Sequence, residues 1–475
     1  METTTTMASS SDTGQKHLRG NLGVFGVTFM VIAGAAPLTV VGGPMALGLG
    51  LGNGAGLPTA YLAVLAVLLL FVTGFTAMTP LVRSAGAFYS YVHTGLGRAT
   101  GIGTGYAALI SYLSLYVGVY ALFGTATDAL VQSFGGPPVP WWIWALVGLA
   151  VISFLGYRNI ELSGKILSVL LVAEVAVVLV LDAAIVLPGG GPEGLSTGFL
   201  EPATVFSGAP GVGLLFAVLS FVGIEATAVF RDEARDPART IPRATFLAVT
   251  SVGIFYAITC WAMISAVGDS KITQVAGDAP EGLLPGLSDH YLGRVGEHLT
   301  ATLFVTSIFA AGITFHNVVS RYLFSLSNQD LLPRRLAYTH PHHGSPSRAS
   351  VVTSILVVGA LLLTVAARLD PIAEMYTWTA GLASVGYVVL LVLTCLAVVV
   401  FFRRHPGDHS FARTFLAPAV GLVGLLVILA MILINLNLLS GNNTIISVLI
   451  IASLIVAYLL GPIVGKLRPQ AALHE

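Results

Sequence analysis

Two acidic side chains stand inside long apolar stretches of this sequence. Glu174 lies in "LLVAEVAVVLVLD" and Glu225 lies in "SFVGIEATAVF". A charged carboxylate at the centre of a bilayer costs about 2.5–3.5 kcal/mol on an insertion scale, and such residues commonly mark ion or proton pathways. For Glu225 three interpretations are open: hydrogen bonding to a broken backbone, proton transfer, or pairing with a cationic ligand. For Glu174 we predict proton coupling or cation binding, with a buried hydrogen-bonded acid as the alternative. Asp182, nearer the outer end of the same run, is expected at the membrane interface.

Two helix-breaking motifs accompany these acids. The stretch "VIAGAAPLTVVGG", residues 31–43, places small residues and Pro37 inside the first apolar run, and the sixth run is interrupted at "FVGIE", residues 221–225. Backbone that leaves a helix inside a membrane must find new partners. Half-helix N-termini favour a carboxylate and C-terminal carbonyls favour an ammonium, so a zwitterion or an organic cation suits such a pair. The alternative is that glycine and proline are simply common in membrane helices.

Three tyrosines lie four residues apart in the third apolar run. Tyr112, Tyr116 and Tyr120 therefore share one face of a helix. Their rings could stack on a ligand side chain or contact an ammonium group. The alternative is helix packing with each hydroxyl hydrogen-bonded inside the protein.

The composition requires a membrane around these elements. The chain has 475 residues, of which 55% are hydrophobic and 9% are charged, and its mean hydropathy is +0.88. A soluble domain is about a quarter charged, so this chain could not cover a water-facing surface. Apolar runs of about 17–33 residues are long enough to cross a bilayer. The sequence predicts twelve of them, near residues 22–47, 57–79, 100–132, 141–157, 162–187, 211–230, 244–267, 295–327, 350–367, 372–402, 414–438 and 443–466.

The basic residues predict the orientation of these twelve spans. With both termini in the cytoplasm, nineteen of the 22 lysines and arginines fall on the inner side, and only Lys271, Arg294 and Arg368 fall outside. This is the bias of the positive-inside rule. Residues 1–20 are polar and lack the apolar segment of a secretory signal peptide. The net charge is zero, so nothing indicates a nucleic acid partner.

The two breaks suggest an internal duplication. Helices one and six are five helices apart, so repeats of five helices would place the breaks in equivalent positions. Interrupted helices at corresponding positions of two halves point to the binding site of a transporter. We therefore predict a cytoplasmic tail over residues 1–20 and a ten-helix core over 21–405, with repeats at about 21–190 and 205–405. Helices eleven and twelve and a short cytoplasmic tail fill residues 406–475.

Three stretches of the chain resemble a known family. They are "TPLVRSAGAFYSYVHTGLGRATG" at 79–101, "SFVGIEATAVFRDEARDPARTIPRA" at 220–244 and "NVVSRYLFSLSNQDLLPRRLAYTHPHHGSPSRA" at 317–349. They are similar to the amino acid–polyamine–organocation permeases, which adopt the LeuT-type fold. The resemblance implies an all-α integral membrane protein with about twelve transmembrane helices, a 5+5 inverted repeat and broken helices one and six.

The resemblance also implies a substrate site. In the family, N–H groups at the break of helix one hold the substrate carboxylate, and carbonyls of helices one and six hold its amino group. Helix three, here with Tyr112 and Tyr116, forms one wall. The family often has Gly-x-Gly character in helix one, where this chain has alanines and Pro37. The residues assigned to the two breaks are Ala33, Gly34, Ala35, Ala36 and Pro37, and Phe221, Val222, Gly223 and Ile224.

The expected function is secondary transport of amino acids across the cytoplasmic membrane by alternating access, coupled to protons or by exchange. Transport of polyamines or other organic amines is the alternative, because the chain adds the acids Glu174 and Glu225 and because the alanines in helix one weaken the carboxylate pocket. A channel or an intramembrane enzyme is not expected, since no nucleophile–base pair or metal set is visible at membrane depth. No cofactor is implied, and Cys260 and Cys395 indicate no disulfide framework. The histidines of "THPHHG" fit the His-Pro pattern of the family better than a metal site.

Overall fold

The computed structural model describes residues 22–82, 87–158, 164–227, 234–405 and 410–467, and these residues form helices joined by short connections. Eleven helices in these ranges are long and apolar enough to cross a membrane, and a bent pair of helices near the N-terminus makes a twelfth span. The predicted all-α fold with about twelve spans is therefore confirmed.

The spans follow the predicted order closely. The first is divided into α1 (Val24–Gly34), α2 (Pro37–Val40), η1 (Val41–Met45) and α3 (Ala46–Leu51). The next four are α4 (Leu57–Met78), α6 (Arg98–Ser133), α7 (Trp141–Arg158) and α8 (Gly164–Val186). The sixth begins with α10 (Pro210–Leu219), and the rest are α11 (Pro237–Val267), α13 (Pro280–Asn328), α14 (Ser347–Ala366), α15 (Thr377–Arg404), α16 (Ala417–Leu439) and α17 (Thr444–Leu467).

The seventh span begins earlier than predicted. Helix α11 begins at Pro237, seven residues before the predicted position 244. Proline fits the first turn of a helix, where its missing N–H has no partner in any case. The first turns of α11 are polar and precede the apolar run, so a prediction from hydropathy starts the helix too late.

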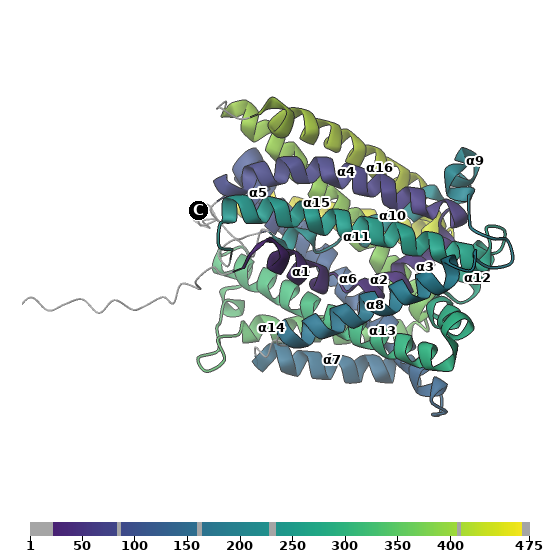
Figure 1. Ribbon diagram of the computed structural model, residues 1–475. Helices are drawn as coiled ribbons and strands as arrows, with labels where there is room; N and C mark the ends of the chain where they lie inside the picture. The colour runs from purple at the N-terminus through teal and green to yellow at the C-terminus, as the bar shows by residue number, and fades with distance from the viewer. Residues whose placement is uncertain (1–21, 83–86, 159–163, 228–233, 406–409, 468–475) are drawn as a thin grey trace, which may run out of the picture.

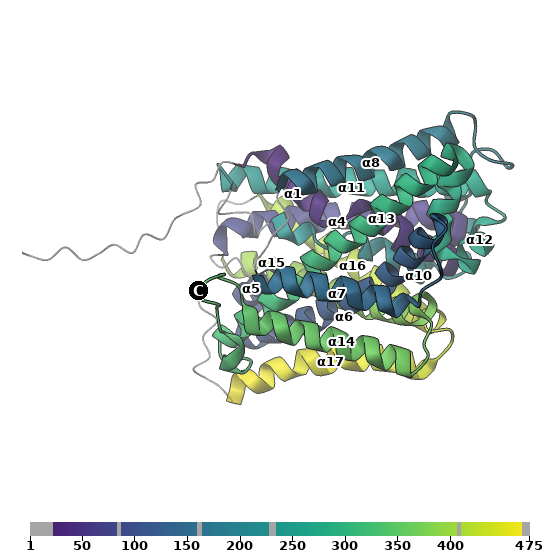
Figure 2. The ribbon, with the colours of Figure 1, turned by 90° about the horizontal axis from the view of Figure 1, so that it is seen from below.

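The last two helices lie at the edge of the bundle. Figure 1 shows α16 along one side, and Figure 2 shows α17 along another. Large apolar side chains on both are exposed, including Ile434 of α16 at 79% and Ile445 of α17 at 71%. In a membrane protein such side chains face lipid, and the ten preceding spans enclose the core.

One local arrangement occurs twice in the fold. Helix α5 (Ala87–Leu96) leads through Gly97 into the third span, and the first part of α13 leads through Gly293 into the eighth span. Both glycines sit within a Leu-Gly-Arg sequence and have positive φ, 97° and 71°. A side chain would disfavour that backbone conformation. The third and eighth spans are five apart, as equivalent elements of two five-helix repeats would be.

The two ends of the bundle are packed differently. At one end α3 lies against α12 (Ile272–Asp278) so closely that a Cβ on Gly50 would come within 2.8 Å of Ala276 backbone atoms. At the other end α1 exposes 81% of Phe25. In Figure 1 these ends are the right and the left of the molecule.

Candidate functional site

The first span is broken between α1 and α2. The helix ends at Gly34, and Ala36 adopts a left-handed conformation with φ 47° and ψ 69°. A non-glycine residue pays about 1–2 kcal/mol for this conformation. Helix α2 then begins at Pro37, and the two parts meet at a bend of 40°. The break lies where the sequence predicted it.

The N–H groups that follow this break are bonded to side chains. The Leu38 N–H donates to Oε2 of Glu174 at 3.4 Å, and the Thr39 N–H donates to the Ser307 hydroxyl oxygen at 3.2 Å. The Ser307 hydroxyl in turn donates to Glu174 Oε2 at 2.8 Å. Glu174 comes from α8 and Ser307 from α13, so three separate spans meet at the start of α2.

These bonds release two carbonyl groups. In a continuous helix the N–H groups of Leu38 and Thr39 would bond to the carbonyls of Gly34 and Ala35. Within the described ranges the structure records no donor to either carbonyl oxygen. The break therefore has its donors occupied and offers acceptors, which favours a ligand that carries a positive charge.

The sixth span breaks after α10 at a turn that contains Gly223. Gly223 has φ 107°, a conformation that side chains disfavour. Its N–H donates to Oε2 of Glu225 at 3.0 Å. The hydroxyl of Tyr387 donates to the same oxygen at 3.1 Å, and the hydroxyl of Tyr112 donates to Oε1. Glu225 thus joins the broken backbone to α6 and α15.

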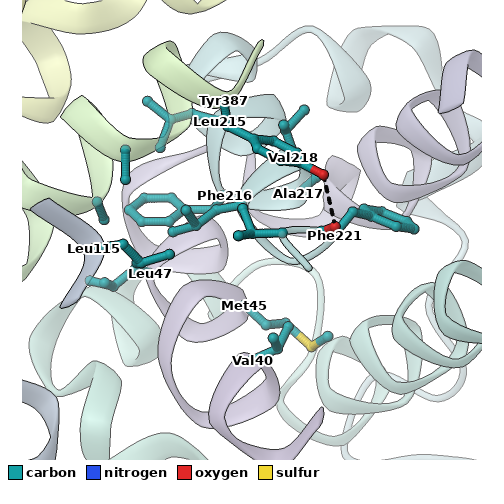
Figure 3. Close-up of a cluster of buried hydrophobic side chains, with 14 of the residues drawn as sticks. Val40, Met45, Leu47, Leu115, Leu215, Phe216, Ala217, Val218, Phe221 and Tyr387 are labelled. Atoms are coloured by element: carbon teal, nitrogen blue, oxygen red, sulfur yellow. Dashed lines mark hydrogen bonds between the residues drawn. The ribbon is translucent and has the colours of Figure 1, made fainter. Parts of the chain in front are cut away.

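Tyr387 also contacts the broken backbone directly. Its hydroxyl lies 3.2 Å from the carbonyl oxygen of Phe221. Figure 3 shows the Tyr387 ring extending toward Phe221, with Val40 and Met45 of the first span in the same apolar cluster. The two breaks therefore share one buried environment.

We predict that Glu225→Gln destabilises the protein. A glutamine offers one acceptor oxygen, and its NH2 group cannot accept, so at least one of the three donors to Glu225 loses its partner. Leaving a buried donor unsatisfied costs about 1–3 kcal/mol. The melting temperature of the purified protein should fall, whereas Glu201→Gln, at an exposed position, should leave it within error. An unchanged melting temperature for Glu225→Gln would contradict this structural role.

The two buried acids differ in how their oxygens are used. Glu225 is 7% exposed and both its oxygens accept hydrogen bonds. Glu174 is 4% exposed, and both recorded donors reach Oε2, so Oε1 has no recorded donor among the described residues. Of these two acids, Glu174 is the one with an oxygen that has no recorded donor, and Oδ1 of Asp182 on the same helix also has none among the described residues.

Asp182 is buried between α8 and α11. It is 5% exposed and accepts a hydrogen bond from the Thr259 hydroxyl at 2.8 Å. It lies two turns beyond Glu174 and one turn before the end of α8 at Val186. Its place at the membrane interface stays a prediction.

The hydroxyls of Tyr112 and Tyr116 have different hydrogen-bond partners. Tyr112 reaches Glu225 at the sixth-span break. The Tyr116 hydroxyl lies 2.6 Å from that of Tyr120 and 2.8 Å from Nδ1 of His316. Nε2 of His316 lies 2.8 Å from the Ser350 hydroxyl, so this network joins α6, α13 and α14. The structure does not bring the Tyr116 hydroxyl together with the breaks.

Comparisons with known sequences bear on this arrangement. Residues 22–460 match the family model described as "Amino acid permease". This chain belongs to the amino acid permease family. An uncharacterized transporter of Mycobacterium tuberculosis is 30% identical over 285 residues, which cover 60% of this chain and 58% of the relative.

Two other relatives of this protein are named after their substrates. The branched-chain amino acid permease BcaP of Bacillus subtilis is 27% identical over 62% of this chain and 58% of its own length. The low-affinity putrescine importer PlaP of Escherichia coli is 24% identical over 74% of this chain and 75% of its own length. The alignments thus span 58% of the Mycobacterium relative and of BcaP.

The remaining residues predicted for the site belong to the two breaks and differ in burial. Phe221, Val222 and Ile224 are buried, whereas Ala33, Gly34 and Ala35 are partly exposed. A Cβ built on Gly34 or on Gly223 would meet no atom within 4 Å. The space next to Gly34 and next to Gly223 is therefore open.

Several residues at the site escaped the sequence analysis. Ser307, Thr39 and Tyr387 bond to the breaks, and the buried hydroxyl of Tyr256 has no recorded partner. The Tyr256 ring lies 6.3 Å from that of Phe221. Serine, threonine and tyrosine are common in membrane helices, so the sequence did not distinguish these residues from others of the same type. Tyr256 is noticed only in the structure, where its buried hydroxyl has no recorded partner.

Two of the histidines in the stretch "THPHHG" lie against each other. The rings of His340 and His343 stack with centroids 4.5 Å apart. Within the ranges that the structure describes, no group of three or more histidine, cysteine, aspartate or glutamate side chains is placed to hold a metal ion.

Proposed function

We propose that this protein is a secondary transporter that moves amino acids, or alternatively polyamines and other organic amines, across the cytoplasmic membrane. The observation that carries the proposal is the pair of broken spans with released carbonyl groups, nearby carboxylates and open space at Gly34 and Gly223. Broken helices near the midplane are the usual place where transporters bind substrate and coupling ions. Membership of the amino acid permease family supports transport rather than catalysis.

The proposed substrate site follows the two breaks. The protonated amine of the substrate would lie against the carbonyls of Gly34 and Ala35, since these lack donors in the described chain. Tyr112 would hold Glu225 and thereby the sixth-span turn in place. The names of BcaP and PlaP, an amino acid permease and a putrescine importer, support both substrate classes.

The proposed transport cycle is alternating access. Two five-helix repeats, over about 21–190 and 205–405, would form the core, and helices one, two, six and seven would rock against three, four, eight and nine. The twofold occurrence of the Leu-Gly-Arg turn supports the repeat. The close packing of α3 on α12, with open space beside α1, matches a state closed at the outer end.

The proposed coupling is to protons or by exchange. Both Glu174 and Glu225 lie at the breaks, but the free Oε1 makes Glu174 the better proton carrier. Glu225 is held by three donors and would serve the broken backbone. Desolvation disfavours the charged form of a buried acid, so proton binding and release are accessible to Glu174.

The proposed topology places both termini in the cytoplasm. Single cysteines introduced as Ala99→Cys, Arg235→Cys and Arg334→Cys should resist an impermeant thiol reagent in intact cells, because the basic residues lie on the inner side. Ser270→Cys and Asn442→Cys, at exposed positions of the other end, should react. The native Cys260 and Cys395 are buried and give little background. The reverse labelling pattern would contradict this orientation.

Transport itself is tested with the purified protein in liposomes. We expect saturable uptake or counterflow of a radiolabelled amino acid or amine from a panel of both classes, and none in empty liposomes. An ion current without saturable solute flux would indicate a channel. Absence of flux and of binding for every panel member would contradict the proposal.

A further inference from the structure

The start of α2 has the properties of a carboxylate-binding site. Helix α2 continues through η1 and α3 as a fifteen-residue segment, Pro37–Leu51. Backbone N–H groups at a helix N-terminus point outward and favour negative charge. Pro37 has no N–H, so Leu38 and Thr39 supply the first donors. An amino acid bound at this break would place its carboxylate on them.

The protein fills this position with its own carboxylate. Oε2 of Glu174 accepts from the Leu38 N–H at 3.4 Å, and Ser307 connects the Thr39 N–H to the same oxygen. The next N–H, that of Val40, bonds to the Ala36 carbonyl at 3.3 Å. The donors at the start of α2 are therefore all engaged, and a second carboxylate there would also be repelled by Glu174.

A second observation points to a cationic ligand at the same place. Oε1 of Glu174 and the carbonyls of Gly34 and Ala35 lack recorded donors in the described chain, and the Glu174 side chain is 4% exposed. A protonated amine supplies several N–H donors and no acceptor. It would satisfy these three acceptors.

From this geometry we infer that Glu174 determines specificity by taking the place of a substrate carboxylate. The substrate is then a primary amine or diamine without an α-carboxylate. This inference rests on the proposed transport function and narrows its substrate class.

The test compares amino acids with their decarboxylated amines. Pairs such as ornithine and putrescine, lysine and cadaverine, and leucine and isoamylamine differ only by the carboxylate. Binding to the full-length purified protein is measured by isothermal titration calorimetry. We expect the wild type to bind at least one amine about tenfold or more tightly than its amino acid, a difference of about 1.4 kcal/mol.

Two variants separate the roles of the carboxylate. Glu174→Ala removes the charge and frees the N–H groups, so it should bind the amino acid of that pair more tightly than the amine. Glu174→Gln keeps an oxygen over the N–H groups but lacks the charge, so it should weaken the amine without gaining the amino acid. Asp182→Asn, on the same helix but bonded to Thr259, should keep the wild-type preference.

The outcomes distinguish this inference from the transport function. If the wild type binds and exchanges amino acids more tightly than their amines, the role of Glu174 is wrong while transport stands. If Glu174→Ala does not fold, the wild-type ranking of each pair decides the question. If no solute of either class binds or moves, the transport proposal itself fails.

Discussion

Gly34→Leu is expected to abolish transport while the protein remains folded. Gly34 is the last residue of α1, has helical backbone geometry, and a Cβ there would meet no atom within 4 Å. A Cβ is therefore accommodated at this position, and leucine is a better helix former than glycine, which costs about 0.8–1 kcal/mol relative to alanine. Its side chain would fill the space beside the broken backbone that we assign to the substrate.

The measurement is uptake into proteoliposomes together with the melting temperature. Gly34→Leu should lose all measurable uptake and keep its melting temperature or raise it slightly. Gly359→Leu is the matched control, because Gly359 lies in α14 with equally open surroundings but far along the chain from either break. Normal uptake by Gly34→Leu would remove the substrate from this location.

Gly223→Leu should also abolish transport, but for two reasons at once. Leucine would enter the same open space, and it would strain a backbone with φ 107°. A lower melting temperature is therefore expected in this variant. Gly34→Leu is the better test, because it fills the open space without placing a side chain on a backbone of positive φ.

Accumulation of substrate is expected to follow a pH gradient and to be independent of sodium. Burial disfavours the charged form of Glu174, and its Oε1 has no recorded donor among the described residues. A carboxyl group in this setting can take up a proton on the acidic side and release it on the other. Protonation would also weaken the link from Glu174 to the start of α2, so charge and backbone position change together.

Glu174→Gln should lose accumulation driven by the pH gradient. The amide can keep its oxygen over Leu38 and Ser307 and place its NH2 group where Oε1 lies, so the fold should be retained. Exchange at saturating substrate should persist, because exchange requires no net proton movement. Asp182→Asn should accumulate substrate normally, since Asp182 contacts Thr259 rather than a break.

Proteoliposomes with an imposed pH gradient, with and without sodium, provide the measurement. Accumulation that follows the sodium gradient would assign coupling to another ion. Accumulation that persists in Glu174→Gln would show that Glu174 is not the proton carrier.

The sequence by itself determined the spans, their number and the positions of both breaks. Bilayer thickness sets the length of an apolar run, so hydropathy locates a span from neighbouring residues alone. Pro37 and Gly223 mark the breaks because their backbone properties are intrinsic to the residue type. The family resemblance rested on short motifs that are equally local, and the comparison over residues 22–460 agrees with it.

Only the tertiary structure decided what each side chain does at the breaks. Glu174 meets Leu38 across 136 positions of sequence and Ser307 across 133, and Glu225 meets Tyr112 across 113. Tyr112 and Tyr116 share a helix face, yet one reaches Glu225 and the other reaches His316. Helix packing chooses these partners, because a hydrogen bond depends on which distant groups come within about 3 Å. The partners of a side chain therefore cannot be predicted from residue type and from spacing along one helix.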